Sequence, residues 1–197
     1  MKYLTLYLTL ISTLAFSSQE NTPVVGQVTM SAGEVEIIRS NGQRISAQRR
    51  SDILVGDILE TGPNGIIHIR FIDEALVSVS CESALKIQQY GTENNQVVEL
   101  DLIEGHIRSI TGTINPAKYI LHTASADVRI TRSPSDFMVS EELGANASFS
   151  VANGGIRVEN YSGALNLGIG GDFNFAEVAK DQSPNGLAFA PAAISCD

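Results

Sequence analysis

The sequence predicts an all-β fold, arranged as a β-solenoid-like roll of short strands, with a β-sandwich as the alternative architecture. Three observations lead to this prediction. Apolar and polar residues alternate with a period of two in many short segments, which is typical of half-buried strands. Glycine, often beside Asp or Asn, separates these segments and marks tight turns. Apolar residues at helical spacing over three turns do not occur after the N-terminal segment, and only 140–147 and 176–180 could each form one helical turn.

The clearest alternation lies in residues 55–87. A glycine-rich loop at 56–65 precedes a strand in which Ile67, Ile69 and Phe71 face the same side. Turn signals of the same kind divide the rest of the chain. Further strands are therefore expected, in chain order, within 24–38, 76–87, 96–110, 119–130, 137–139, 149–158 and 165–175.

Length and composition fit one domain with short flanking segments. The chain has 197 residues, of which 43% are hydrophobic and 18% charged, as in globular proteins. Residues 1–17 resemble an export signal, because Lys2 precedes an apolar run that ends in the small-x-small motif Ala15-Phe16-Ser17. That run is short for a membrane span, although an uncleaved anchor remains the alternative. We expect a linker at 18–23, the domain at 24–180 and a C-terminal tail at 181–197.

The charge balance excludes two classes of partner. The formal net charge is −9, and no basic cluster occurs apart from the doublet Arg49-Arg50. Neutralisation of phosphates supplies most of the affinity for nucleic acids, so nucleic-acid binding is not expected. Stable binding to anionic lipid surfaces is not expected for the same reason.

Two cysteines occur, Cys81 and Cys196. In an oxidising compartment an even number of cysteines suggests a disulfide. The alternative is that Cys81 is a buried strand residue and Cys196 is free in the tail. Spacing alone leaves both possibilities open.

No metal or cofactor site is predicted. His68, His106 and His122 each lie in a strand-like segment, and no short-range pair such as HxH or HExxH occurs. We interpret all three as solvent-facing strand residues.

No catalytic site is predicted either. A glycosidase needs two carboxylates about 5–10 Å apart, whereas Asp57 and Asp73 lie beside turns, where carboxylates cap backbone N–H groups. No Gly-x-Ser-x-Gly motif occurs. We therefore expect no enzyme activity. The other carboxylates that could form a hydrolytic pair are Asp52, Glu60, Glu74, Asp101 and Glu104.

The order of motifs resembles the FecR-type domain of bacterial envelope proteins. The resemblance covers most of the chain after residue 23, including a strand–Gly–strand unit at 102–108 and a closing unit at 151–168. Two segments depart from the family pattern: Asp73-Glu74 replaces an Asp-Gly turn, and 132–137 replaces an Arg-Gly-Thr before an aromatic residue. The residues that carry the central signature are Gly56, Asp57, Leu59, Thr61, Gly62, Pro63, Gly65, Phe71, Asp73, Val77, Ser83, Leu85 and Ile87.

The resemblance implies an exported, non-enzymatic module for protein interaction or signalling in the envelope of a Gram-negative bacterium, either periplasmic or secreted. Well-known members of the family carry a cytoplasmic sigma-factor-binding segment and one membrane helix, and the expected exported chain has room for neither. A protein partner of the envelope is expected to contact an exposed strand edge or two turn loops. The loop residues that we expect to face the partner are Thr61, Pro63, Asn64, Arg132, Ser133 and Asp136.

A glycan- or exopolysaccharide-binding module is the alternative function, with a glycoside hydrolase ranked below it. The chain has five Tyr, seven Phe and no Trp, so platforms for stacking sugars are scarce. Phe71, Phe137, Phe149 and Phe173 are expected in the core.

Overall fold

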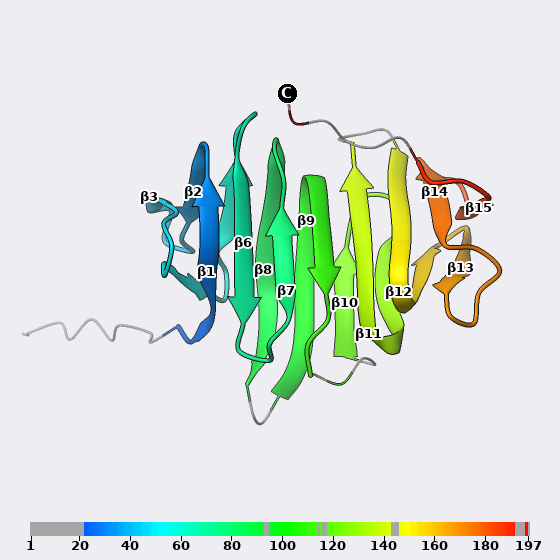
Figure 1. The fold of residues 1–197 in the computed structure, drawn as a ribbon, viewed down its shortest axis with the longest axis horizontal. Coiled ribbons are helices and arrows are strands. Elements are labelled where there is room, and N and C mark those ends of the chain that lie inside the picture. The colour runs from blue at the N-terminus through cyan, green and yellow to red at the C-terminus, as the bar shows by residue number, and fades with distance from the viewer. Residues whose placement is uncertain are drawn as a thin grey trace, which may run out of the picture.

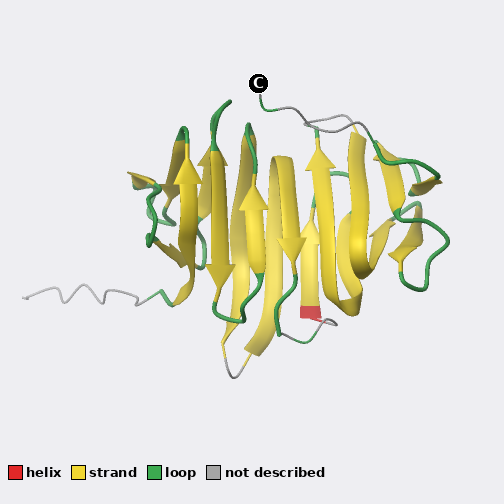
Figure 2. Ribbon diagram, in the orientation of Figure 1, coloured by secondary structure: helices red, strands yellow, loops and turns green. Residues whose placement is uncertain are grey.

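The all-β prediction is confirmed by a computed structural model, which describes residues 22–92, 95–113, 115, 118–142, 146–191 and 196 (Figures 1 and 2). The predicted export signal at 1–17 lies outside the described residues. Fifteen strands are connected by hydrogen bonds. In chain order they are β1 (Val24–Ala32), β2 (Val35–Ile38), β3 (Arg44–Ser46), β4 (Asp52–Leu54), β5 (Ile58–Thr61), β6 (Ile66–Phe71), β7 (Leu76–Val79), β8 (Ser83–Thr92), β9 (Asn95–Ile110), β10 (Tyr119–His122), β11 (Asp127–Glu141), β12 (Asn146–Asn160), β13 (Gly163–Gly168), β14 (Phe175–Ala179) and β15 (Asn185–Leu187).

The strands form two layers. One layer has the order β4, β1, β6, β7, the second half of β9, the second half of β11, the first half of β12, β14 and β15. The other has the order β3, β2, β5, β8, the first half of β9, β10, the first half of β11, the second half of β12 and β13. In Figure 1, β1, β6 and β7 lie in the front layer, and β8 lies in the layer behind them.

Three long strands, β9, β11 and β12, belong to both layers. Residues 98–101 of β9 pair with β10, whereas 105–110 pair with β11 in the opposite layer. A glycine with positive φ marks the crossing in β9 (Gly105, 90°) and in β12 (Gly154, 74°), where a residue with a Cβ would be strained. The layers face each other as the two sheets of a β-sandwich do. The long strands pass from one layer to the other, as strands do in a roll. The solenoid-like roll stays a prediction.

The core lies between the layers. Ile67, Leu85 and Leu100, for example, are fully buried, because the period-two pattern of their strands directs them inward. Phe71, Phe137 and Phe149 are also buried, as predicted. The prediction for Phe173 is wrong: it is 37% exposed.

The position of Phe173 has a local cause. Its ring lies over Gly186 in β15, where an added Cβ would meet the ring Cδ2 at 2.3 Å. The ring therefore lies beside β15, the terminal strand of its layer, and not in the core between the layers. β15 and Cys196 both lie in the segment that was expected to be a tail.

Two further expectations are corrected. Residues 140–141 end β11, residues 146–147 begin β12 and residues 176–179 lie in β14, so these residues are strand and do not form the helical turns that were considered possible, while 143–145 lie outside the described residues. The reason is pairing, since Ser140 is opposite both His106 and Ser148, and Ala176 is opposite Phe149. No helix long and apolar enough to cross a membrane occurs in the described part of the chain.

The Asp73-Glu74 departure from the family pattern forms a strained turn. Glu74 has a φ of 69°, a region that favours glycine. Asp73 stabilises the turn, because its Oδ1 accepts hydrogen bonds from the amide of Ala75 (3.2 Å) and the hydroxyl of Tyr90 (2.6 Å). The Tyr90 ring stacks on Phe71 with 4.1 Å between ring centroids. The turn is therefore anchored to the core although one of its residues is conformationally unfavourable.

Candidate binding cleft

A cleft opens where several strands reach the same end of the two layers. The end of β5, the turn from β7 to β8, the Gly105 bend in β9 and the end of β11 meet there. They enclose a cavity of about 710 Å³, a volume in the range of ligand pockets. Its lining residues are Glu60, Thr61, Glu82, Ser83, Ala84, Glu104, Gly105, His106, Glu141 and Glu142.

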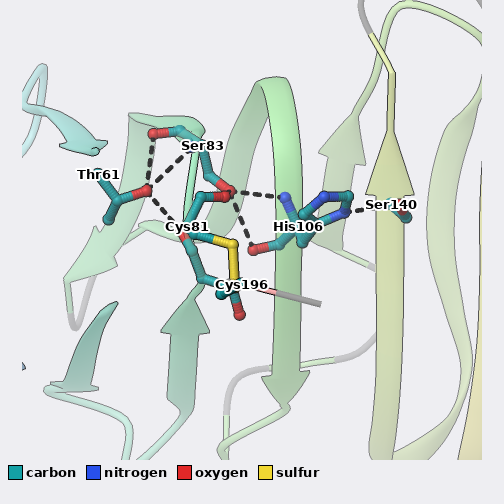
Figure 3. Close-up of a disulfide and its surroundings, with 7 residues drawn as sticks. Thr61, Cys81, Ser83, His106, Ser140 and Cys196 are labelled. Atoms are coloured by element: carbon teal, nitrogen blue, oxygen red, sulfur yellow. Dashed lines mark hydrogen bonds between the residues drawn. A yellow bond between two sulfur atoms is a disulfide. The ribbon is translucent and has the colours of Figure 1, made fainter. Parts of the chain in front are cut away.

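A hydrogen-bond network fixes the floor of this cleft (Figure 3). Thr61 Oγ1 accepts a hydrogen bond from the Ser83 amide at 2.9 Å and donates one to the Ser80 carbonyl. Ser83 Oγ donates to the Cys81 carbonyl and accepts from the His106 amide, both at 2.8 Å. Each hydroxyl thus joins neighbouring chain segments at the point where they change layer. The floor of the cleft is therefore held together by hydrogen bonds between these segments.

The same network corrects the prediction for Thr61, whose side chain was expected to face a partner. Thr61 is only 7% exposed, because its hydroxyl is the link between β5 and the turn before β8. Among the loop residues predicted with it, Pro63 and Asn64 are exposed. Pro63 lines a neighbouring cavity of about 320 Å³ together with Glu34, Glu36 and Arg44.

The second predicted loop lies at the opposite end of the layers. Asp136 pairs with Ile110, whereas Glu141, at the cleft, pairs with Gly105. Five residues of extended strand separate these positions by about 16 Å. The structure therefore does not bring the two predicted loops together.

The residues of this second loop differ in exposure. Arg132 and Ser133 are exposed. Asp136 is only partly exposed, because Arg108 holds its carboxylate with two hydrogen bonds of 2.8 and 2.6 Å. The Asp136 carboxylate is thus already paired within the chain.

Glutamates surround the cleft. Five of its lining residues are Glu, and none is Lys or Arg. Glu60 is paired with Arg44 at 2.8 Å, on the side of the cleft. Among the described residues, Glu82, Glu104 and Glu142 take part in no ion pair. The unneutralised carboxylates make the cleft strongly electronegative.

Glu141 differs from the other glutamates because it is buried. It is 2% exposed, and its Oε1 accepts a hydrogen bond from Ser125 Oγ at 2.9 Å. Its Oε2 has no hydrogen-bond partner among the described residues. A buried carboxylate oxygen without a partner is energetically costly. The unpartnered Oε2 atom therefore distinguishes Glu141 from the other glutamates that line the cleft.

His106 completes the cleft as an uncharged group. Its Nδ1 lies 2.6 Å from Ser140 Oγ. Burial lowers the pKa of His106, against the opposing effect of the Glu142 and Glu82 carboxylates. The imidazole is therefore neutral at pH 7 and does not compensate the glutamates.

A disulfide joins Cys81, beside the cleft floor, to Cys196 (Figure 3). The two Cα atoms are 5.7 Å apart across a sequence separation of 115 residues. This bond brings the end of the chain next to the outer face of β9 and β11. A further cavity of about 390 Å³ is lined there by Met138, Phe175, Pro191 and Cys196, among others.

The histidines are less exposed than predicted. His106 is partly buried as described, and His68 is also partly buried. His122 lies between two carboxylates, with Nδ1 2.7 Å from Asp127 Oδ1 and Nε2 3.3 Å from Glu99 Oε1. Cross-strand neighbours contact the rings of His106 and His122. In the residues that the structure describes, no three His, Cys, Asp or Glu side chains are placed to hold a metal ion.

The turn carboxylates have the structural role that was predicted. Asp57 Oδ2 accepts hydrogen bonds from the Leu54 amide (2.7 Å) and from Arg39 (2.5 Å). Burial raises the pKa of Asp57, and these two hydrogen bonds oppose the effect. Asp73 caps the amide of Ala75.

Sequence reasoning missed Glu82, Glu141 and Glu142. A signal for one of them was present: Glu60-Thr61, Glu82-Ser83 and Glu104-Gly105 recur with a spacing of 22 residues. Each pair stands where the chain changes layer, so the glutamates gather at one end. No comparable signal leads to Glu141 and Glu142, whose place is set by the pairing of β11 with β9.

Comparisons with known proteins show a family and a similar fold. The family model described as FecR protein matches residues 57–157, about half of the chain. Two crystal structures of a proposed anti-sigma factor from Parabacteroides distasonis ATCC 8503 are similar in fold, with 12% and 13% sequence identity and TM-scores of 0.52 and 0.53. Each similarity covers 66% of this chain and 59% of that chain, so the chain spans about three-fifths of those structures. No curated protein matches the sequence.

Proposed function

Because the chain belongs to the FecR protein family, we propose that it is a non-enzymatic signalling module of the bacterial cell envelope that binds a protein partner. Residues 1–17 act as an export signal in this proposal, which places the module in the periplasm or outside the cell. The partner contacts the end of the molecule that carries the cleft. Pro63 and Asn64 lie beside this contact, whereas Arg132, Ser133 and Asp136 lie away from it.

The observation that carries the proposal is the position of the cleft within the family match. All ten residues that line the cavity fall between residues 57 and 157. A site formed by strands within the part of the chain that matches the family model is a reasonable location for a function that family members share. The likeness to a proposed anti-sigma factor concerns the fold, and it is compatible with a regulatory role.

Strand addition at a sheet edge is the less favoured mode of binding. Three of the strands at the ends of the two layers, β3, β4 and β15, have only three residues each. Short edge strands offer few free backbone groups to a partner strand. The cleft provides a larger and chemically distinctive surface.

Site-specific crosslinking tests the proposal. A photo-crosslinking amino acid placed at Asn64, beside the cleft, is expected to capture an envelope protein in the native bacterium. The same amino acid at Ser133, at the opposite end, is the matched control and should capture much less. Mass spectrometry identifies the captured protein. A polysaccharide array tested in parallel contradicts the proposal if glycans are enriched and no protein is crosslinked.

One observation favours glycan binding as a second candidate function. Tyr161 is 80% exposed and borders a cavity of about 420 Å³ together with Asp127, Asn160 and Lys180. An exposed aromatic ring with polar neighbours can stack on a sugar and bind its hydroxyl groups. Replacement of Tyr161 by Ala should then abolish binding on the array. The same glycans should also be assayed for cleavage, because turnover lost in Glu104→Gln would replace the binding proposals with hydrolysis.

A further inference from the structure

We propose that the cleft is a receptor for a cationic side chain, Lys or Arg, presented by a protein partner. This inference rests on the proposed function and specifies the chemistry by which the partner is recognised. It also gives the unpaired glutamates of the cleft a role, since their side chains make no hydrogen bond to any other residue that the structure describes.

The first argument is the charge of the cleft. Glu82, Glu104 and Glu142 line one cavity and are without ion-pair partners in the described part of the chain. Several acidic side chains elsewhere are matched by arginine within the fold, for example Glu36 and Glu60 by Arg44 and Glu159 by Arg129 and Arg157. The absence of Lys and Arg from the lining leaves a negative potential that attracts a positive group.

The second argument is independent and concerns Glu141. The residue is 2% exposed and lines this cavity as well as the neighbouring cavity of about 420 Å³, where Ser125 donates to Oε1, and its Oε2 has no hydrogen-bond partner among the described residues. A buried carboxylate is stable when a charged donor pairs with it. An ammonium or guanidinium group that enters the cleft supplies such a donor and removes the cost of the unpaired oxygen.

The third argument separates a cationic side chain from a metal ion. No group of three His, Cys, Asp or Glu in the described residues has the arrangement that a metal ion needs. Carboxylates spread around a cavity of about 710 Å³ are too dispersed for one small ion. An Arg side chain has five donors on a planar group and a Lys has three donors, so either can contact several carboxylates at once.

Peptide binding tests the inference directly. The probe is a fluorescent, end-capped peptide Gly-Arg-Lys-Arg-Gly, with Gly-Gln-Gln-Gln-Gly as the uncharged control, measured by fluorescence anisotropy with the whole chain in its oxidised form. We expect binding of the cationic peptide only, with an affinity that falls as salt is added. The double variant Glu82→Gln/Glu104→Gln should weaken binding about tenfold or more.

A control of equal net charge distinguishes the cleft from general attraction. Asp172→Asn/Glu177→Gln neutralises two exposed carboxylates that do not line the cleft, and it should leave the affinity within about twofold. If both double variants weaken binding equally, the attraction is general and the inference is wrong.

Glu141→Gln separates binding from folding. The substitution removes a buried charge while it keeps the shape of the side chain, so the variant should fold with unchanged or higher stability. Its affinity for the cationic peptide should fall about tenfold. Unchanged affinity in this variant overturns the role of Glu141, and saturable binding of Ca²⁺ that displaces the peptide overturns the inference in favour of a metal site.

The outcome for this inference is distinguishable from that for the proposed function. A protein crosslinked at Asn64 together with no cationic peptide binding supports the function and overturns the cationic side chain. Peptide binding in the cleft without any crosslinked envelope protein supports the receptor for a cation and overturns the protein-binding function.

Discussion

Gly105 shows how strongly a crossing between the layers restricts the type of amino acid at one position. Its φ is +90°, and a Cβ there would lie 2.1 Å from Ser83 Oγ. Gly105→Ala should lower the free energy of unfolding by about 2–4 kcal/mol, because backbone strain and a steric clash act together. Urea denaturation measures the change.

Gly42 provides the control for that substitution. Its φ is +82°, but an added Cβ would have nothing within 4 Å. Gly42→Ala should therefore cost only about 1–2 kcal/mol from strain. Equal losses for the two variants would show that the contact with Ser83 has no effect.

Glu74 presents the opposite case, a residue with a side chain where glycine fits better. Its φ of 69° costs about 1–2 kcal/mol, while glycine loses about 0.5–1 kcal/mol in chain entropy. Glu74→Gly should thus raise the free energy of unfolding by about 0.5–1 kcal/mol in urea. The exposed ion pair with Arg70, at 3.3 Å, is a minor loss. A lower stability than the wild type would contradict this account of the turn.

His106 makes stability depend on pH. Burial lowers the pKa of its imidazole below the ordinary 6.5, so the unfolded chain binds a proton more readily than the folded chain. The free energy of unfolding should therefore fall as the pH decreases through 6.5 toward the folded pKa, and should be unaffected by this group above about pH 7. Stability measured from pH 7.5 to 5 checks the slope.

His106→Gln is the control for the pH dependence. Glutamine does not titrate, so the variant should lose the part of the slope between pH 7 and the folded pKa. The carboxylates of Glu82 and Glu142 remain in both proteins. An identical slope in wild type and variant would assign the dependence to other groups.

At the scale of elements, the disulfide ties the end of the chain to the turn before β8. Cys196→Ser should lower the free energy of unfolding by about 2–4 kcal/mol, because the bond closes a loop of more than a hundred residues in the unfolded chain. Cys196 is the exposed partner, so its replacement leaves no buried hydroxyl, in contrast to Cys81 at 4% exposure. Urea denaturation with and without reductant measures the effect.

The response to reductant identifies the source of that change. Reduced wild type should be as stable as Cys196→Ser, and the variant itself should be insensitive to reductant. An unchanged urea midpoint in reduced wild type would show that the bond adds no stability.

The individual strands were largely predictable from the sequence, and their connections between layers were not. Ile67, Ile69 and Phe71 alternate clearly, and they form the buried side of β6. In β11 the alternation is interrupted by four exposed residues, 131–134, before Ser135 and Phe137 turn inward again. A local pattern cannot distinguish such an interruption from a loop, because the two halves pair with different neighbours.

At the scale of the whole molecule, strand exchange makes the two layers one folding unit. Each layer contains part of β9, β11 and β12, so unfolding of one layer disrupts strands that belong to the other. We expect one cooperative urea transition. Near-UV circular dichroism reports on buried Tyr90 and Tyr119, far-UV circular dichroism reports on the strands, and the two curves should coincide. Separate midpoints would contradict the expectation.

The cleft illustrates why a site can be harder to predict than a fold. Thr61 has the sequence context of an exposed loop, yet its hydroxyl is used inside the structure. Glu82 and Glu141 are far apart in the chain and line the same cavity only because β9 pairs with both β8 and β11. Their chemistry depends on register between distant strands, which the residue types do not encode locally.

In the part of the chain that the structure describes, the two layers end in terminal strands. Length is therefore an adjustable property of this architecture, because a strand can be gained or lost at either extremity while the middle keeps its pairing. The cleft is made by strands from the middle. Relatives with a different number of strands could accordingly keep the same cleft, and evolution could alter the strands around it without rebuilding it.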